Sequence, residues 1–159
     1  MFGEWQSARD FFSAVGQASD YVSRHRGRLE SMEAREGARA QGYEPSVSRS
    51  RADVNGTAAT VARMDYEARE QARVDEAYRL IDLGVHVAER VGELTNREHA
   101  DVLELVYEVR MQPITVADRL GVSVRTVYNR RDAALAAADA LGFGALTCGS
   151  QLLSTQVNL

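Results

Sequence analysis

The chain has 159 residues, a formal net charge of −4, 45% hydrophobic residues and 26% charged residues, which is an ordinary composition for a folded protein. This length suits one domain, or a small domain with an extension. A single cysteine, Cys148, excludes an intrachain disulfide and a cysteine-paired zinc site. The sequence contains neither a secretory signal nor an apolar run of the ~20 residues that a membrane span needs, so we expect a cytoplasmic protein without a membrane partner.

A first helix is predicted over residues 5 to 36, where helix breakers are few. Its apolar positions recur at helical spacing and form a broad face. They are Trp5, Ala8, Phe12, Val15, Val22 and Leu29. The basic cluster at residues 24 to 28 has two interpretations. It could contact the backbone of a nucleic acid such as DNA, or it could be a solvated helix surface with charge pairs, and we favour the solvated surface.

Residues 37 to 56 are predicted to be a linker because Gly42, Pro45 and Asn55-Gly56 interrupt them. A second long helix is then predicted over residues 57 to 93, with a three-and-four apolar spacing. Its apolar positions are Val61, Met64, Ala68, Val74, Ala77, Ile81, Val85, Ala88 and Val91. This stripe can pack against the first helix as an antiparallel pair or against another chain. Because one chain has little else to cover it, we expect a homodimer.

Three shorter helices are predicted next. The first is capped by Thr95, with Glu98 as its capping-box partner, and runs to about Arg110. After a turn at Pro113, Thr115 is predicted to cap the second helix and Ser123 the third, which extends to Leu141. Gly121 allows the tight turn between the last two helices. Val127 and Ala134 would face the core, and the pattern predicts a helix-turn-helix module.

The residues of this segment resemble region four of bacterial sigma factors, a module that grips the upstream promoter element. The matching positions are Leu94, Thr95, Val102, Leu103, Tyr107, Thr115, Val116, Ala117, Leu120, Gly121, Val122, Ser123, Thr126, Val127 and Arg130. The whole layout, with long helices before this module, is similar to phage late-gene transcriptional regulators of the ArpU-like type. The resemblance implies that the third helix of the module contacts bases.

The predicted DNA-reading residues lie near the start of that last helix. Outward-facing positions there reach base edges in the major groove. Arg125 can bond guanine, Asn129 can pair with adenine and Val124 can touch a thymine methyl group. The other expected DNA-binding residues are Tyr128, Thr126, the phosphate-contacting Arg131 and Arg119, and the helix-capping Thr115 and Ser123.

The charge distribution agrees with this assignment. Arg119, Arg125, Arg130 and Arg131 have no acidic residue among them, whereas acids outnumber bases between residues 57 and 110. Asp132 and Asp139 follow, so strong binding by a single copy is in doubt. A three-helix unit of this kind can instead dock a protein, and arginines on a helix are often only solvated.

Catalysis is poorly supported by the sequence. The three histidines, His25, His86 and His99, are scattered, and no set of four metal ligands is apparent. There is no phosphate-cradling glycine loop and no nucleophile elbow. We therefore expect a protein that is not an enzyme and that binds neither a cofactor nor a metal.

The sequence thus predicts an all-α protein in three parts. Residues 1 to 93 form long helices, arranged as a helical hairpin or in a coiled-coil-like way, for assembly. Residues 94 to 141 form a three-helix helix-turn-helix domain, and residues 142 to 159 form a flexible or docked tail. The expected function is transcriptional regulation on double-stranded DNA, with RNA polymerase as a further candidate partner. The alternatives are a phage small terminase subunit and a protein-interaction module that binds RNA polymerase or another regulator.

Overall fold

The structure is a computed structural model that describes residues 5–40 and 54–148. These residues form helices and no strand, so the predicted all-α class is confirmed. None of the helices in these two ranges is long and apolar enough to cross a membrane. The predicted tail lies mostly outside the described residues, except that residues 143 to 146 form a short helix.

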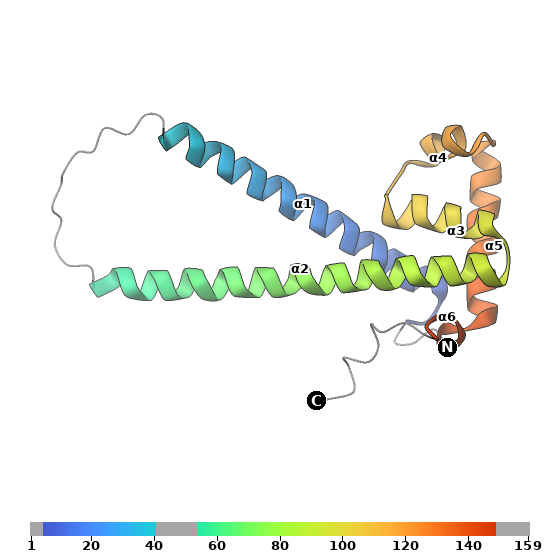
Figure 1. The fold of residues 1–159 in the computed structure, drawn as a ribbon, viewed down its shortest axis with the longest axis horizontal. Coiled ribbons are helices and arrows are strands. Elements are labelled where there is room, and N and C mark those ends of the chain that lie inside the picture. The colour runs from blue at the N-terminus through green and yellow to red at the C-terminus, as the bar shows by residue number, and fades with distance from the viewer. Residues whose placement is uncertain (1–4, 41–53, 149–159) are drawn as a thin grey trace.

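Two long helices dominate the molecule (Figure 1). Helix α1 spans Ala8–Ala40 and helix α2 spans Val54–Leu94, so both extend into the segment predicted as a linker. Residues 41–53 of that segment lie outside the described residues. The two helices pack together where α1 begins and diverge toward their other ends. In the diverging part Leu29, Val61, Met64 and Tyr66 are exposed, and Met64 reaches 62% exposure.

Close packing between α1 and α2 is centred on Gly84. A Cβ atom added there would lie 2.7 Å from Cγ1 of the fully buried Val15. The glycine therefore lets the two backbones approach each other, at the cost of weaker helix propensity. Tyr21 adds a polar contact farther along, where its hydroxyl donates to Glu70 Oε2 at 2.9 Å. Beyond this contact α1 and α2 separate.

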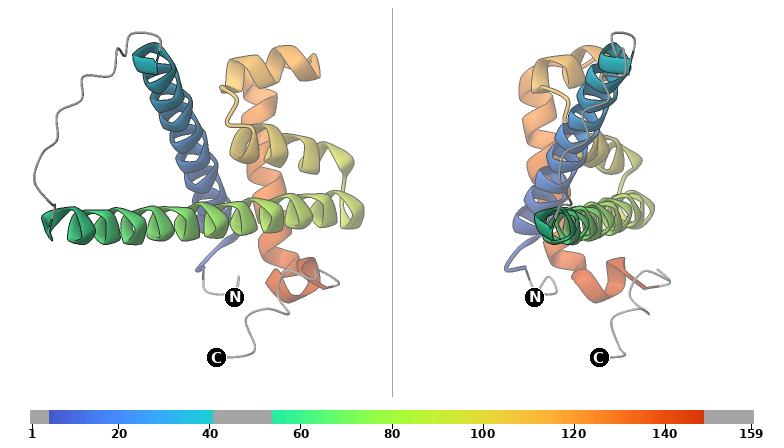
Figure 2. Two further views of the ribbon diagram at one scale, coloured as in Figure 1. Left: turned by 60° about the vertical axis from the view of Figure 1, so that its left-hand side comes forward. Right: turned by 90° about the vertical axis from the view of Figure 1, so that its left-hand side faces the viewer.

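The shorter helices follow α2 in a compact group (Figure 2). They are α3 (Arg97–Leu103), a π-helical turn η1 (Glu104–Glu108), α4 (Pro113–Leu120), α5 (Val124–Leu141) and α6 (Phe143–Leu146). The π turn closes where the Val109 amide donates to the Glu104 carbonyl at 3.0 Å. The backbone then reverses at Arg110, whose φ of 60° is left-handed. The predicted continuous helix to Arg110 is thus two segments that end at Glu108.

Two predicted helix caps are wrong, one by a single residue and the other by three. Asn96, rather than Thr95, caps α3, because its side-chain oxygen accepts from the Glu98 amide at 3.0 Å. The Thr95 hydroxyl instead donates to the Val91 carbonyl at the end of α2. Helix α4 starts at Pro113, which lies in its first turn, and Gln112 precedes it without a side-chain cap. Thr115 therefore lies inside α4 and does not cap it.

The main core joins the two halves of the chain. Its buried residues come from α1, α2, α3, η1, α5 and α6. They are Ala8, Phe11, Phe12, Val15, Leu83, Val87, Ala88, Val91, Leu103, Tyr107, Ala134, Leu135, Ala138 and Leu146. Leu146 of α6 is fully buried, so the start of the predicted tail is part of this core. The predicted boundary at residue 94 therefore separates helices that share one core.

Candidate nucleic-acid interface

The candidate site is built on α4, a tight turn and α5. Gly121 ends α4 with a φ of 65°, a left-handed conformation that favours glycine, and the Val122 amide donates back to the Ala117 carbonyl at 3.0 Å. Ser123 then caps α5, since its hydroxyl oxygen accepts from the Thr126 amide at 3.1 Å. The predicted Gly121 turn and Ser123 cap are both confirmed.

A small apolar cluster fixes the angle between these two helices. Its buried members come from α3, η1, α4 and α5. They are Val102, Leu105, Val116, Ala117 and Val127. The half-buried Val122 and Val124 also pack against it. Val127 thus faces inward as predicted. Val124 is half-buried against this cluster, so only part of its side chain is accessible to a ligand.

Three of the predicted reading residues share the outer face of α5 near its N-terminus. Arg125 and Asn129 are exposed, and Tyr128 is 41% exposed. Residues 125, 128 and 129 are three and four positions apart, so they lie on one side of the helix. Thr126 is half-buried, and its hydroxyl lies 2.8 Å from that of Ser123. This places Thr126 in the cap of α5 rather than on the outer face.

The arginines that follow are engaged with other side chains. Arg130 donates to Glu98 Oε1 at 2.8 Å and so joins α5 to α3. Arg131 donates to Asp132 Oδ1 at 2.8 Å, and its guanidinium lies 5.0 Å from the centre of the Tyr128 ring. Only 22% of the Arg131 side chain is exposed. The predicted phosphate contact at Arg131 therefore has competing partners in the free protein.

The remaining predicted contacts lie on α4. Arg119 is exposed near the end of α4, and its Nη1 lies 4.0 Å from the Met111 sulfur. Thr115 is also exposed, in the interior of the same helix. Both positions are accessible to a ligand that lies against α4.

The sequence analysis did not predict that Arg9 lies beside the predicted reading face. Arg9, at the start of α1, donates to Asp132 Oδ1 at 3.2 Å across 123 residues of sequence. Hydrogen bonding from Arg131, followed by its charge and the contacts of Arg9, lowers the pKa of the Asp132 carboxyl below its usual value. No periodic pattern within either helix could have revealed this pairing.

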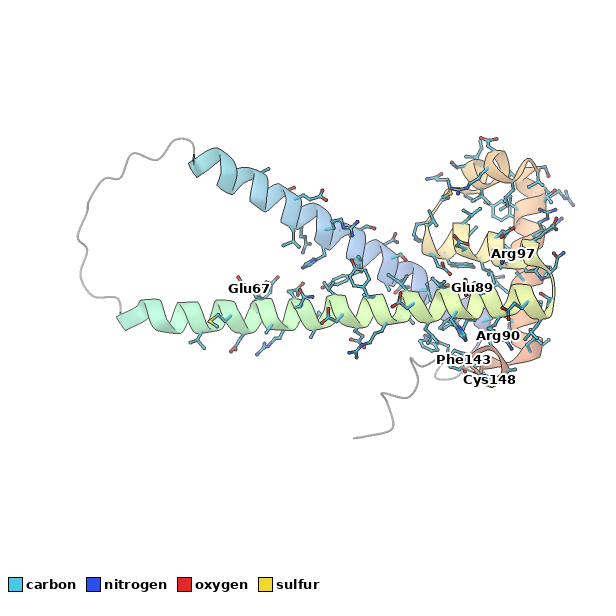
Figure 3. The ribbon with its side chains drawn as sticks, in the orientation of Figure 1. Glu67, Glu89, Arg90, Arg97, Phe143 and Cys148 are labelled. Atoms are coloured by element: carbon cyan, nitrogen blue, oxygen red, sulfur yellow. The ribbon has the colours of Figure 1, made fainter. Side chains whose placement is uncertain are left out.

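A half-buried acid, Glu108, lies in the π turn. Burial, together with the nearby charges of Glu104 and Glu89, raises the pKa of Glu108 to about 7. Its Oε1 is buried without a hydrogen-bond partner. Glu89 belongs to α2, where that helix passes under α3 (Figure 3). In the described ranges, no group of three or more His, Cys, Asp and Glu side chains could hold a metal ion.

Comparison with protein-family models, curated proteins and solved structures finds no match to this chain. The similarity to sigma region four therefore remains a prediction from the residues quoted above.

Proposed function

We propose that α4, the Gly121 turn and α5 form a helix-turn-helix that binds the major groove of double-stranded DNA. The observation that carries this proposal is the exposed group of Arg125, Tyr128 and Asn129 at the capped start of α5. An arginine and an asparagine one turn apart are suited to guanine and adenine edges. The apolar cluster beneath them holds the helix rigidly, which base readout requires.

The proposed role is transcriptional regulation at a promoter, in the manner of a phage regulator in the cytoplasm. Two exposed arginines, Arg119 and Arg125, are without an ion pair among the described residues of this site, whereas Arg130 and Arg131 face acids. Each phosphate that a protein neutralises adds affinity, so one copy has few cations for tight binding. A homodimer on a repeated or palindromic site would double them.

The second candidate function is docking of a protein such as RNA polymerase. The observation that favours it is the exposure of two apolar side chains, Val109 shortly before α4 and Ile114 in its first turn. Exposed apolar side chains suit a protein surface better than a phosphate backbone. Binding of this kind would depend weakly on salt, whereas DNA binding falls steeply as salt rises.

The test is selection of bound sequences from a random duplex library, followed by titration of the selected site at several salt concentrations. Arg125→Ala and Asn129→Ala should each reduce preference for that site by roughly 1 to 3 kcal/mol. Arg79→Ala serves as a control because it removes the same charge from an exposed position of α2. Its sequence preference should equal that of the wild type.

The mass of the complex distinguishes the remaining alternatives. Two copies on one selected site would support the dimeric regulator. A large ring on DNA would favour the terminase subunit.

The substitutions test the reading face itself. If neither Arg125→Ala nor Asn129→Ala alters sequence preference, the reading face is assigned wrongly. If no duplex is bound at any salt concentration, protein docking becomes the better interpretation.

A further inference from the structure

An acidic residue lies on the proposed reading helix, one turn beyond Tyr128. Asp132 is exposed on α5, and a lone carboxylate there would repel a DNA phosphate. Its Oδ1 atom, however, accepts from Arg131 Nη2 at 2.8 Å, from Arg131 Nε at 3.1 Å and from Arg9 Nη2 at 3.2 Å. Two guanidinium groups thus surround one carboxylate, and the three side chains together carry a net charge of about +1.

Helix α1 supplies the second of these guanidiniums and is anchored on α5 where it does so. The backbone amide of Ala8 donates to Asp139 Oδ1 at 2.6 Å. Asp132 and Asp139 are about two helical turns apart on α5, so together they hold the first turn of α1 along that helix. The fully buried Phe11 and Phe12 anchor the same turn in the main core. Arg9 therefore projects from a fixed backbone.

The two guanidiniums differ in accessibility. The Arg9 side chain is 56% exposed, whereas Arg131 is 22% exposed and lies against Tyr128. Because both Nη2 atoms bond the same oxygen, they lie no more than 6.0 Å apart. Two planar donors at this separation can bind the oxygens of one phosphate group. Arg9 is the group that a ligand would meet first.

We propose that Arg9 belongs to the DNA-contacting surface, where Asp132 holds it beside Arg131 to bind a backbone phosphate. The inference rests on the proposed function and adds a contact that the helix-turn-helix alone does not contain. In this arrangement Arg131, held by Tyr128 and Asp132, is the inner donor to the phosphate, and Arg9 is the outer and more exposed donor. Helix α1 then takes part directly in binding, besides its place in the core.

The experiment measures the affinity of the full chain for its selected duplex and for a scrambled duplex over a series of salt concentrations. Arg9→Ala should weaken binding to both duplexes by the same factor, about 3- to 10-fold, because a phosphate contact carries no sequence information. The slope of log affinity against log salt should fall by about 0.9, the value for one phosphate contact on duplex DNA. Arg9→Lys should restore most of the slope, since lysine keeps the positive charge.

Two controls make the result decisive. Arg79→Ala removes one positive charge from α2, and it should leave both affinity and slope unchanged. Thermal unfolding of Arg9→Ala shows whether the fold is retained. The inference is overturned if Arg9→Ala behaves like Arg79→Ala, or if its affinity falls with an unchanged salt slope, because the effect would then be structural. Absence of any wild-type binding would overturn the proposed function as well, which distinguishes the two failures.

Discussion

Replacing Glu108 with glutamine tests the energetics of the π turn independently of function. Burial and the charges of Glu104 and Glu89 raise the pKa of Glu108 from 4.5 to about 7 in the folded protein. Between these two pH values the folded chain keeps a proton that the unfolded chain releases. The contribution of Glu108 to the free energy of unfolding therefore falls as the pH rises from about 4.5 to about 7 and changes little above that.

The size of this effect follows from the two pKa values. A shift of this size corresponds to roughly 3 kcal/mol for a fully enclosed group. Because Glu108 is only partly enclosed, solvent screening reduces the expected loss to roughly 1 to 2 kcal/mol. Glutamine has a similar shape and no charge at any pH. Glu108→Gln should therefore be about 1 to 2 kcal/mol more stable than the wild type at pH 8 and nearly equal to it at pH 4.5.

The assay is urea unfolding followed by circular dichroism at pH values from 4.5 to 8. Glu76→Gln is the matched control, because Glu76 is exposed on α2 and its replacement should change stability by less than about 0.5 kcal/mol. If Glu108→Gln and the wild type show parallel stability profiles over this pH range, the Glu108 carboxyl ionises as freely as an exposed one. Burial would then not be what sets the protonation of Glu108.

Two further substitutions test the packing. Gly84→Ala should lower the free energy of unfolding by about 1 to 2 kcal/mol, because its Cβ would lie 2.7 Å from a Val15 methyl group. Gly27→Ala on α1 should instead raise the free energy of unfolding by about 0.5 to 1 kcal/mol, since nothing lies within 4 Å of the added Cβ. Equal effects of the two substitutions in urea unfolding would contradict the close approach of α1 and α2. Leu146→Ala should cost about 2 to 5 kcal/mol in the same assay because Leu146 is fully buried, while the exposed Leu94→Ala should cost far less. A small loss for Leu146→Ala would show that α6 does not stabilise the core.

The sequence predicted the helices well because their signals are local. The Ser123 hydroxyl and the left-handed Gly121 act within one turn, so the local order of residues is enough to locate the start of α5. The caps of α3 and α4 were misplaced where two candidates competed. Thr95 and Asn96 are adjacent cap-forming residues, and Pro113 is favoured in the first turn of a helix, which moves the start of α4 ahead of Thr115.

The candidate site was harder to predict because its electrostatics depend on contacts between elements. Residues 119 to 131 contain four arginines and no acid, which predicts a basic surface. In the structure, however, Arg130 donates a hydrogen bond to Glu98 of α3 and Arg131 donates one to Asp132. Arg9 comes from the opposite end of the chain. Helical periodicity also could not decide how far Val124 is buried, since that depends on the cluster under α4. Local pattern identifies the helix, and tertiary packing decides which of its side chains remain available.

Helix α5 contributes side chains to both apolar clusters, so the proposed reading face is connected to the two long helices. Its first half packs through Val127 on the small cluster with α4, and its second half packs through Ala134, Leu135 and Ala138 on the core with α1 and α2. Displacing α1 from α2 would therefore also remove packing partners from the second half of α5. The long helices and the proposed reading face are thus joined through one helix that packs in both clusters.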